Sequence, residues 1–186
     1  MKNQMIDSEL LQKLKDKWVI LDTNFILNAS RYPNKYNLVL EELKSVNIEI
    51  TSLNFILLEI YKGSDIRAHF TEKKELIDDL IDAILPINSL HENANLILFA
   101  YRKKAQHLSI TDLYIASALK TYSKELFLIT ENLKDFPGDL FTWNGYINVP
   151  KISELNTYGI VSYNEELYQK AMNDLNKAGK LKSKVV

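Results

Sequence analysis

The chain is organised around the stretch Trp18-Val19-Ile20-Leu21-Asp22-Thr23-Asn24. Four large apolar residues run directly into an acid, a hydroxyl and an amide. A short continuous apolar run with β-branched members is typical of a strand buried on both faces, as at the centre of a parallel sheet. Asp22 then falls at the carboxyl end of the strand, the edge where open α/β sheets bind ligands. A helix-capping role for Asp22 and Asn24 is the structural alternative.

The composition indicates an ordered, compact chain. Its 186 residues are 46% apolar, carry a net charge of −1 and include no cysteine. The lack of cysteine excludes disulfides and thiolate metal sites, and the net charge gives no global sign of nucleic-acid binding. No run approaches the roughly 18 apolar residues of a membrane span, and residues 1–17 lack the apolar block of a secretory signal. We therefore expect a cytoplasmic protein with no membrane partner.

Helical and strand-like segments alternate along the chain. Further strands are expected at 48–51, 126–130 and 146–149, and a weak edge strand at 85–87. Helices are expected at 8–17, 25–31, 38–45, 54–62 (closed by Gly63), 64–83, 91–106 and 111–122. Strands separated by helices predict an α/β fold, with a parallel sheet and helices on both faces. We expect an N-terminal helical extension (1–17), a main domain (18–150) and a C-terminal helical extension (151–186) with a polar joint at 156–159.

One acid interrupts an apolar helix. Glu59 lies in Phe55-Ile56-Leu57-Leu58-Glu59-Ile60, which is otherwise apolar almost all round. A buried, unpaired carboxylate is costly, so such residues are paired, protonated or bound to a metal. This position favours a functional role for Glu59. The alternative is that Glu59 marks a narrow solvent-facing stripe or pairs with Lys62 three residues later.

A second acid, Asp112, begins a helix. Ser109-Ile110-Thr111-Asp112 is close to a capping box, in which the acid meets free backbone N–H groups. Asp112 also shares a helical side with Ile115 and Leu119. The two roles are compatible, because a helix that starts at the edge of the sheet would aim Asp112 at a pocket near Asp22.

A polar loop follows the second strongly buried strand. Thr130, Asn132 and Asp135 fall just past its carboxyl end. We take Asp135 rather than Glu131 as a fourth acid, because strand alternation turns Glu131 away from the side that Thr130 faces. The alternative is that Asp135 only caps the turn. Four carboxylates are hard-oxygen donors that suit Mg²⁺ or Mn²⁺, and a close cluster of acids repels itself unless it binds a cation or a proton.

The order of these motifs resembles the PIN-domain family, which includes the VapC-type toxin ribonucleases. The matching pieces are Ile20-Leu21-Asp22-Thr23-Asn24, Leu58-Glu59-Ile60, Thr111-Asp112-Leu113-Tyr114-Ile115-Ala116-Ser117-Ala118 and Thr130-Glu131-Asn132-Leu133-Lys134-Asp135-Phe136. The resemblance spans residues 18–149. It implies an α/β/α sandwich, three or four acids that hold Mg²⁺ or Mn²⁺, and hydrolytic cleavage of RNA. It also implies a homodimer in many members and an inhibitory antitoxin in some.

The resemblance assigns roles to residues of this chain. Asp22 and Asp112 would be the main metal ligands, and Glu59 would bind directly or through water. Many members carry Asp where this chain has Asn132, so either Asn132 or Asp135 completes the site. The residues that would orient the ligands from behind are Thr23, Asn24, Thr130 and Asn132. Candidate cations for the RNA backbone are Lys62, Arg67, Arg102, Lys103 and Lys104.

Two other functions remain open at this point. An aspartate-nucleophile phosphatase of the haloacid dehalogenase type also begins with an apolar strand and an acid. Its chemistry needs a second acid two residues later, where this chain has Asn24. The other alternative is a non-catalytic PIN-like domain that binds RNA or protein. The amide at Asn132 supports it, because a site that lacks one of four acids can hold metal poorly.

Overall fold

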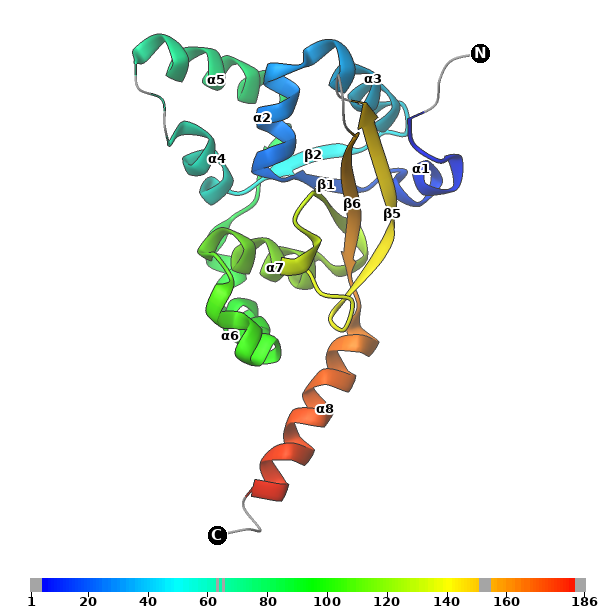
Figure 1. Cartoon of the computed structure of the whole chain (residues 1–186), viewed down its shortest axis with the longest axis vertical. Helices are drawn as coiled ribbons and strands as arrows, with labels where there is room; N and C mark the ends of the chain where they lie inside the picture. Colours follow the sequence, from blue (N-terminus) through cyan, green and yellow to red (C-terminus); the bar gives the residue numbers. More distant parts are fainter. Residues whose placement is uncertain (1–4, 63, 65, 151–154, 183–186) are drawn as a thin grey trace.

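The computed structural model describes residues 5–62, 64, 66–150 and 155–182, and the side chains of residues 102–104 and 178–182 lie outside that description. Figure 1 shows a central sheet with helices on both of its faces. A long C-terminal helix extends away from the sheet (Figure 1). Within the described residues, no helix is both long and apolar enough to cross a bilayer.

The sheet is mixed. Its strands, in chain order, are β1 (Trp18–Leu21), β2 (Glu49–Ser52), β3 (Ala83–Ile84), β4 (Leu126–Thr130), β5 (Phe141–Pro150) and β6 (Leu155–Tyr163). Their order across the sheet is β3-β2-β1-β4-β6-β5. β1 lies at the centre and pairs in parallel with β2 and β4, and β2 pairs in parallel with β3. β6 is antiparallel to both β4 and β5. The expected α/β class is confirmed.

In the part of the chain that the structure describes, eight α-helices cover the sheet or extend from it. They are α1 (Ser8–Leu14), α2 (Thr23–Arg31), α3 (Pro33–Lys44), α4 (Asn54–Tyr61), α5 (Arg67–Leu80), α6 (His91–Tyr101), α7 (Ile110–Tyr122) and α8 (Glu165–Lys182). Short 3₁₀ turns occupy Ile87–Leu90, Arg102–His107, Ser123–Glu125 and Leu133–Asp135. Helices α2 to α5 lie on one side of the sheet and α6 and α7 on the other (Figure 1). This arrangement follows from right-handed crossovers, because the chain crosses the sheet from β1 to β2 and β3 in one direction and returns from β3 to β4 in the other.

The two strands predicted to be buried form the centre of the core. Val19, Ile20 and Leu21 in β1 are fully buried, and every residue of β4 is buried. The register pairs Leu21 with Ile129, and the backbone N–H of Asp22 donates to the Ile129 carbonyl at 3.0 Å. Asp22 and Thr130 therefore leave the sheet side by side at its carboxyl edge.

The C-terminal part of the chain differs most from expectation. Residues 156–159, expected as a polar joint, belong to β6, which lies between β4 and β5 in the sheet. The expected strand at 146–149 is the second half of a ten-residue strand, β5. The segment after residue 150, expected as a polar joint followed by a helix, therefore adds a strand to the sheet before α8 begins. The expected parallel pairing holds among β1, β2, β3 and β4, whereas β5, expected as a further strand of that parallel sheet, is antiparallel to its neighbour β6.

Smaller corrections concern the ends of elements. The helix expected from residue 64 begins at Arg67, and the edge strand is Ala83–Ile84 rather than 85–87. The helix expected over 91–106 ends at Tyr101 and continues as a 3₁₀ turn. Gly63, expected to close a helix, lies outside the described residues.

Candidate functional site

Asp22 follows β1 and caps α2. Its Oδ1 accepts a hydrogen bond from the Thr23 backbone N–H at 2.7 Å, and its Oδ2 accepts one from the Thr130 hydroxyl at 2.7 Å. The residue is buried. Burial raises the pKa of the Asp22 carboxyl, and the nearby acids Glu59 and Glu131 raise it further, against the two hydrogen bonds. Asp22 has the helix-capping role that the sequence predicted, and the carboxylate that caps α2 also lies close to other acids.

Glu59 lies on the exposed side of α4, so its position is not that of a buried acid. This corrects the argument from the apolar sequence around it, because the exposed Leu58 shares the solvent side with it. Its Oε2 accepts from the Thr23 hydroxyl at 2.8 Å and its Oε1 accepts from the Thr111 hydroxyl at 2.6 Å. The structure shows no ion pair between Glu59 and Lys62, both of which are described. Hydroxyls from α2 and α7 hold the carboxylate instead.

Asp112 lies in the first turn of α7 and is partly buried. The Ser109 hydroxyl accepts from the Asp112 backbone N–H at 3.0 Å and donates to Asp112 Oδ2 at 2.5 Å. Burial raises the pKa of Asp112 to about 6, and Asp135, Asp22 and Glu59 add to the increase in that order, while Ser109 opposes it. The helix-capping role of Ser109 expected here is confirmed, whereas the Asp112 carboxylate bonds to the Ser109 hydroxyl in place of the expected backbone N–H groups.

The loop after β4 connects Asp135 to Asp22. The Asn132 backbone N–H donates to the Thr130 hydroxyl at 2.9 Å, and that hydroxyl donates in turn to Asp22. The Asn132 side-chain amide donates to Asp135 Oδ2. Asp135 is among the acids that raise the pKa of Asp112, whereas Glu131 is exposed and acts on Asp22. Asp135 is therefore close enough to affect Asp112, and Glu131 is close enough to affect Asp22. The choice of Asp135 as the fourth acid of the site stays a prediction.

Two aromatic residues that the sequence did not point to hold this loop. The Tyr101 hydroxyl donates to the Asp135 carbonyl at 2.5 Å, and the Trp143 indole N–H donates to the Phe136 carbonyl at 2.8 Å. Phe136 is fully buried, as expected for an anchor of the loop. Tyr101 comes from α6 and Trp143 from β5, so no spacing within a single motif could have indicated them.

The donor chemistry of the four acids fits a hard divalent cation. They offer only carboxylate oxygens, and neighbouring acids raise the pKa values of both Asp22 and Asp112 in addition to burial. A cation would relieve that repulsion, and carboxylates suit Mg²⁺ or Mn²⁺. No group of three or more Asp, Glu, His or Cys side chains is assembled as metal ligands among the residues that the structure describes. The sharing of one ion by Asp22, Glu59 and Asp112 stays a prediction.

The remaining predicted residues lie around this edge. Thr23 and Thr130 contact the acids directly, and Asn132 contacts Asp135, as described above. Asn24 is exposed on the first turn of α2. Thr111, whose hydroxyl donates to Glu59, was not predicted as a site residue. Its position directly before Asp112 was the one feature of the sequence that could have indicated this role.

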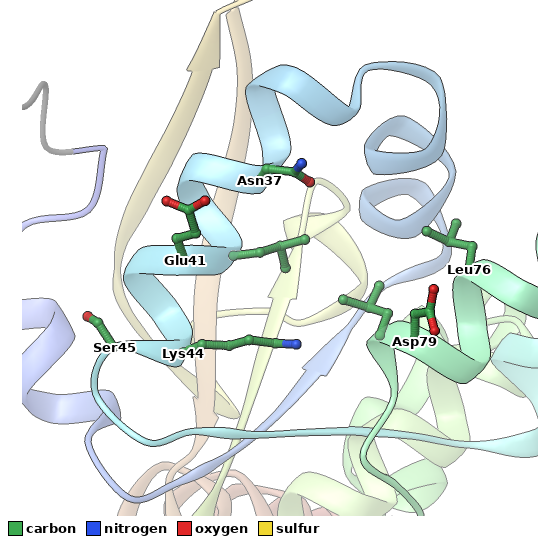
Figure 2. A pocket seen from close by; sticks show the side chains of 8 residues that line it. Asn37, Glu41, Lys44, Ser45, Leu76 and Asp79 are labelled. Carbon is green, nitrogen blue, oxygen red and sulfur yellow. The ribbon is translucent and has the colours of Figure 1, made fainter.

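A separate groove lies between α3 and α5, away from the acids. Its volume is about 540 Å³, and Leu40, Leu76 and Leu80 form its apolar floor. Figure 2 shows Glu41, Lys44 and Asp79 among the side chains that line it, so the groove carries charges of both signs. None of the four acids lines this groove.

Comparison with known proteins shows a likeness of structure. No protein-family model and no curated protein matches the sequence. The fold is similar to that of a chain in the crystal structure of VapBC2 from Rickettsia felis bound to a DNA fragment from their promoter. The TM-score is 0.51 and the sequence identity 24%, over 63% of this chain and 89% of that chain. The likeness is one of fold.

Proposed function

We propose that this protein is a Mg²⁺- or Mn²⁺-dependent endoribonuclease that hydrolyses RNA phosphodiester bonds at the carboxyl edge of its sheet. The observation that carries the proposal is the electrostatic state of Asp112. Three other acids, from the end of β1, from α4 and from the loop after β4, raise its pKa in addition to burial, to about 6. Acids with strongly perturbed pKa values that converge from separate elements are characteristic of functional sites.

The residues of this edge have distinct roles in the proposed reaction. A bound Mg²⁺ or Mn²⁺ supplies an activated water and neutralises the charge that develops on the phosphate. Asp22 and Asp112 would hold the ion directly, and Glu59 would hold it directly or through water. Thr130 fixes the orientation of the Asp22 carboxylate, and Ser109 does the same for Asp112. Such partners restrict ligand rotation and are needed for tight metal binding.

Two exposed cations that follow Glu59 closely in the sequence are candidates for holding the RNA backbone. Lys62 follows α4, which carries Glu59, and Arg67 begins α5. Phosphate contacts of this kind bind RNA without reading its sequence, and added salt weakens them. The other three candidate cations, at 102–104, have side chains outside the described residues.

The proposal extends to a regulatory partner. A solved structure with a similar fold is that of VapBC2 bound to a DNA fragment from their promoter. By analogy of fold, and in agreement with the resemblance of the motifs to VapC-type toxins, we propose that an inhibitory antitoxin binds this protein. A homodimer is part of the same proposal.

Cleavage assays test the proposed activity. Purified protein is incubated with single-stranded and structured RNA, with Mn²⁺ or with EDTA. Asp112→Ala removes a proposed ligand, and Asp174→Ala is a matched control at an exposed position on α8. We expect the wild type and Asp174→Ala to cleave RNA only with Mn²⁺, and Asp112→Ala to be inactive. Cleavage that persists in EDTA or in Asp112→Ala would refute the mechanism. A wild type that binds Mn²⁺ but cleaves no RNA would favour the non-catalytic alternative.

A further inference from the structure

We infer that Thr111 is a positioning residue that fixes Glu59 relative to the two aspartates of the proposed metal site. The inference rests on the proposed function. Its basis is a pair of hydrogen bonds to the two oxygens of one exposed carboxylate. Thr23 Oγ1 donates to Glu59 Oε2 at 2.8 Å, and Thr111 Oγ1 donates to Glu59 Oε1 at 2.6 Å.

The two threonines occupy corresponding places beside the two aspartates. Thr23 directly follows Asp22, and Thr111 directly precedes Asp112. Each threonine therefore links Glu59 to a backbone segment that also carries a predicted ligand. The position of Glu59 is set from two sides, although α4, which carries it, begins at the end of a different strand, β2.

Thr111 is better suited to this task than an exposed residue would be. Thr111 is only 4% exposed, and its β-branched side chain has few rotamers in a helix. Glu59, in contrast, is exposed and has three side-chain torsions to restrict. A rigid donor that holds a mobile carboxylate lowers the conformational entropy lost when the carboxylate binds an ion.

The hydroxyl of Thr111 can be removed with little cost to the fold. Thr111→Val keeps the shape of the side chain, and the Glu59 oxygen that loses its partner can bind water because Glu59 is exposed. Thr121 on the same helix provides a matched control. Its hydroxyl accepts from the Asn93 side-chain amide at 2.9 Å and donates to the Ser117 carbonyl at 2.8 Å, about 15 Å along the helix from Thr111. Thr121→Val therefore makes the same chemical change away from Glu59.

The experiment measures Mn²⁺ affinity by titration calorimetry and the melting temperature in EDTA. Thr111→Val should weaken Mn²⁺ binding by about 10- to 100-fold, the usual effect of removing a group that orients a metal ligand. Its melting temperature in EDTA should stay close to that of the wild type. Thr111→Ser keeps the hydroxyl and should restore most of the affinity. Thr121→Val should bind Mn²⁺ as the wild type does.

A double-mutant cycle tests whether Thr111 acts through Glu59. In a Glu59→Gln background, Thr111→Val should cause no further loss of Mn²⁺ affinity, because the carboxylate that it positions is gone. The inference would be overturned if Thr111→Val bound Mn²⁺ as tightly as the wild type does. It would also be overturned if Thr111→Val lowered Mn²⁺ affinity equally in the wild-type and Glu59→Gln backgrounds. Either result would leave the proposed function intact. A wild type that binds no Mn²⁺ would instead refute the proposed metal site, and the inference would fail with it.

Discussion

Replacing Asp112 by Asn should stabilise the metal-free protein. The Asp112 carboxyl is partly buried and close to three other acids, and its pKa is about 6 instead of its ordinary 3.8. The native state therefore holds the Asp112 proton more tightly than the unfolded chain does. Ionisation of Asp112 then lowers the free energy of unfolding. Asn cannot ionise, yet its amide oxygen can still accept the hydrogen bond from Ser109.

The size of the effect follows from the pKa difference. A rise from 3.8 to about 6 is roughly 2 units, and each unit corresponds to about 1.4 kcal/mol. Solvent screening reduces this upper bound of about 3 kcal/mol because Asp112 is partly exposed, so we expect about 1 kcal/mol. In the wild type, the ionised Asp112 lowers the free energy of unfolding by its full amount above pH 6. This destabilisation disappears as the pH falls toward 3.8. For a chain of this length, 1 kcal/mol corresponds to about 2–4 °C in melting temperature.

Thermal unfolding in EDTA measures the effect. Asp112→Asn should melt about 2–4 °C above the wild type at pH 8. This difference in melting temperature should shrink at pH 4.5. At saturating Mn²⁺ the wild type should instead melt above Asp112→Asn, because an ion at 100 times its Kd adds about 2.7 kcal/mol to the free energy of unfolding of a protein that binds it. Asp174→Asn, at an exposed position on α8, should match the wild type throughout. An Asp112→Asn variant that melts at or below the wild-type temperature at pH 8 would show that the ionised Asp112 does not destabilise the metal-free protein.

Three further predictions concern the loop after β4 and the core beside it. Phe136→Ala removes a fully buried ring, and denaturant unfolding should show that it lowers the free energy of unfolding by about 3–5 kcal/mol. A decrease below about 1 kcal/mol would contradict the role of Phe136 as the anchor of the loop. Tyr158→Phe removes a hydroxyl that lies 2.6 Å from the buried Tyr36 hydroxyl, and it should lower the free energy of unfolding by about 1–3 kcal/mol in the same assay. An unchanged free energy of unfolding would contradict this prediction. Asp135→Asn should weaken Mn²⁺ binding more than Glu131→Gln, because Asp135 is partly buried and Glu131 is exposed; a loss in the Glu131 variant alone would identify the other acid as the fourth ligand.

The central strands could be predicted from the sequence because burial on both faces leaves a continuous apolar run. This holds for β1 and β4, whose residues are almost all buried. The same rule failed for β6, in which Asn156 is polar yet buried. Its amide donates to the Tyr36 hydroxyl at 2.9 Å, and Tyr36 lies 120 positions earlier on α3. A polar residue that finds its partner so far away in sequence looks like part of a loop when read alone.

The candidate site could be predicted in part for a related reason. Asp22 and Thr130 follow buried strands, so their place at one edge follows from strand order. The place of Glu59 did not follow from its apolar neighbours, since its side of α4 is exposed and hydroxyls from other helices hold it. The supports of the loop, Tyr101 and Trp143, act through contacts between distant elements.

The most direct test of the central claim is the position of Mn²⁺ in crystals of the wild-type protein, located by its anomalous scattering. The proposal predicts one ion at the carboxyl edge of the sheet, with oxygens of Asp22 and Asp112 within about 2.6 Å of it and Glu59 bound directly or through one water. If Asp22 and Asp112 oxygens stay more than about 8 Å apart in every copy at saturating Mn²⁺, they cannot share an ion at such ligand distances. That separation, or an ion bound elsewhere with this edge empty, would contradict the claim.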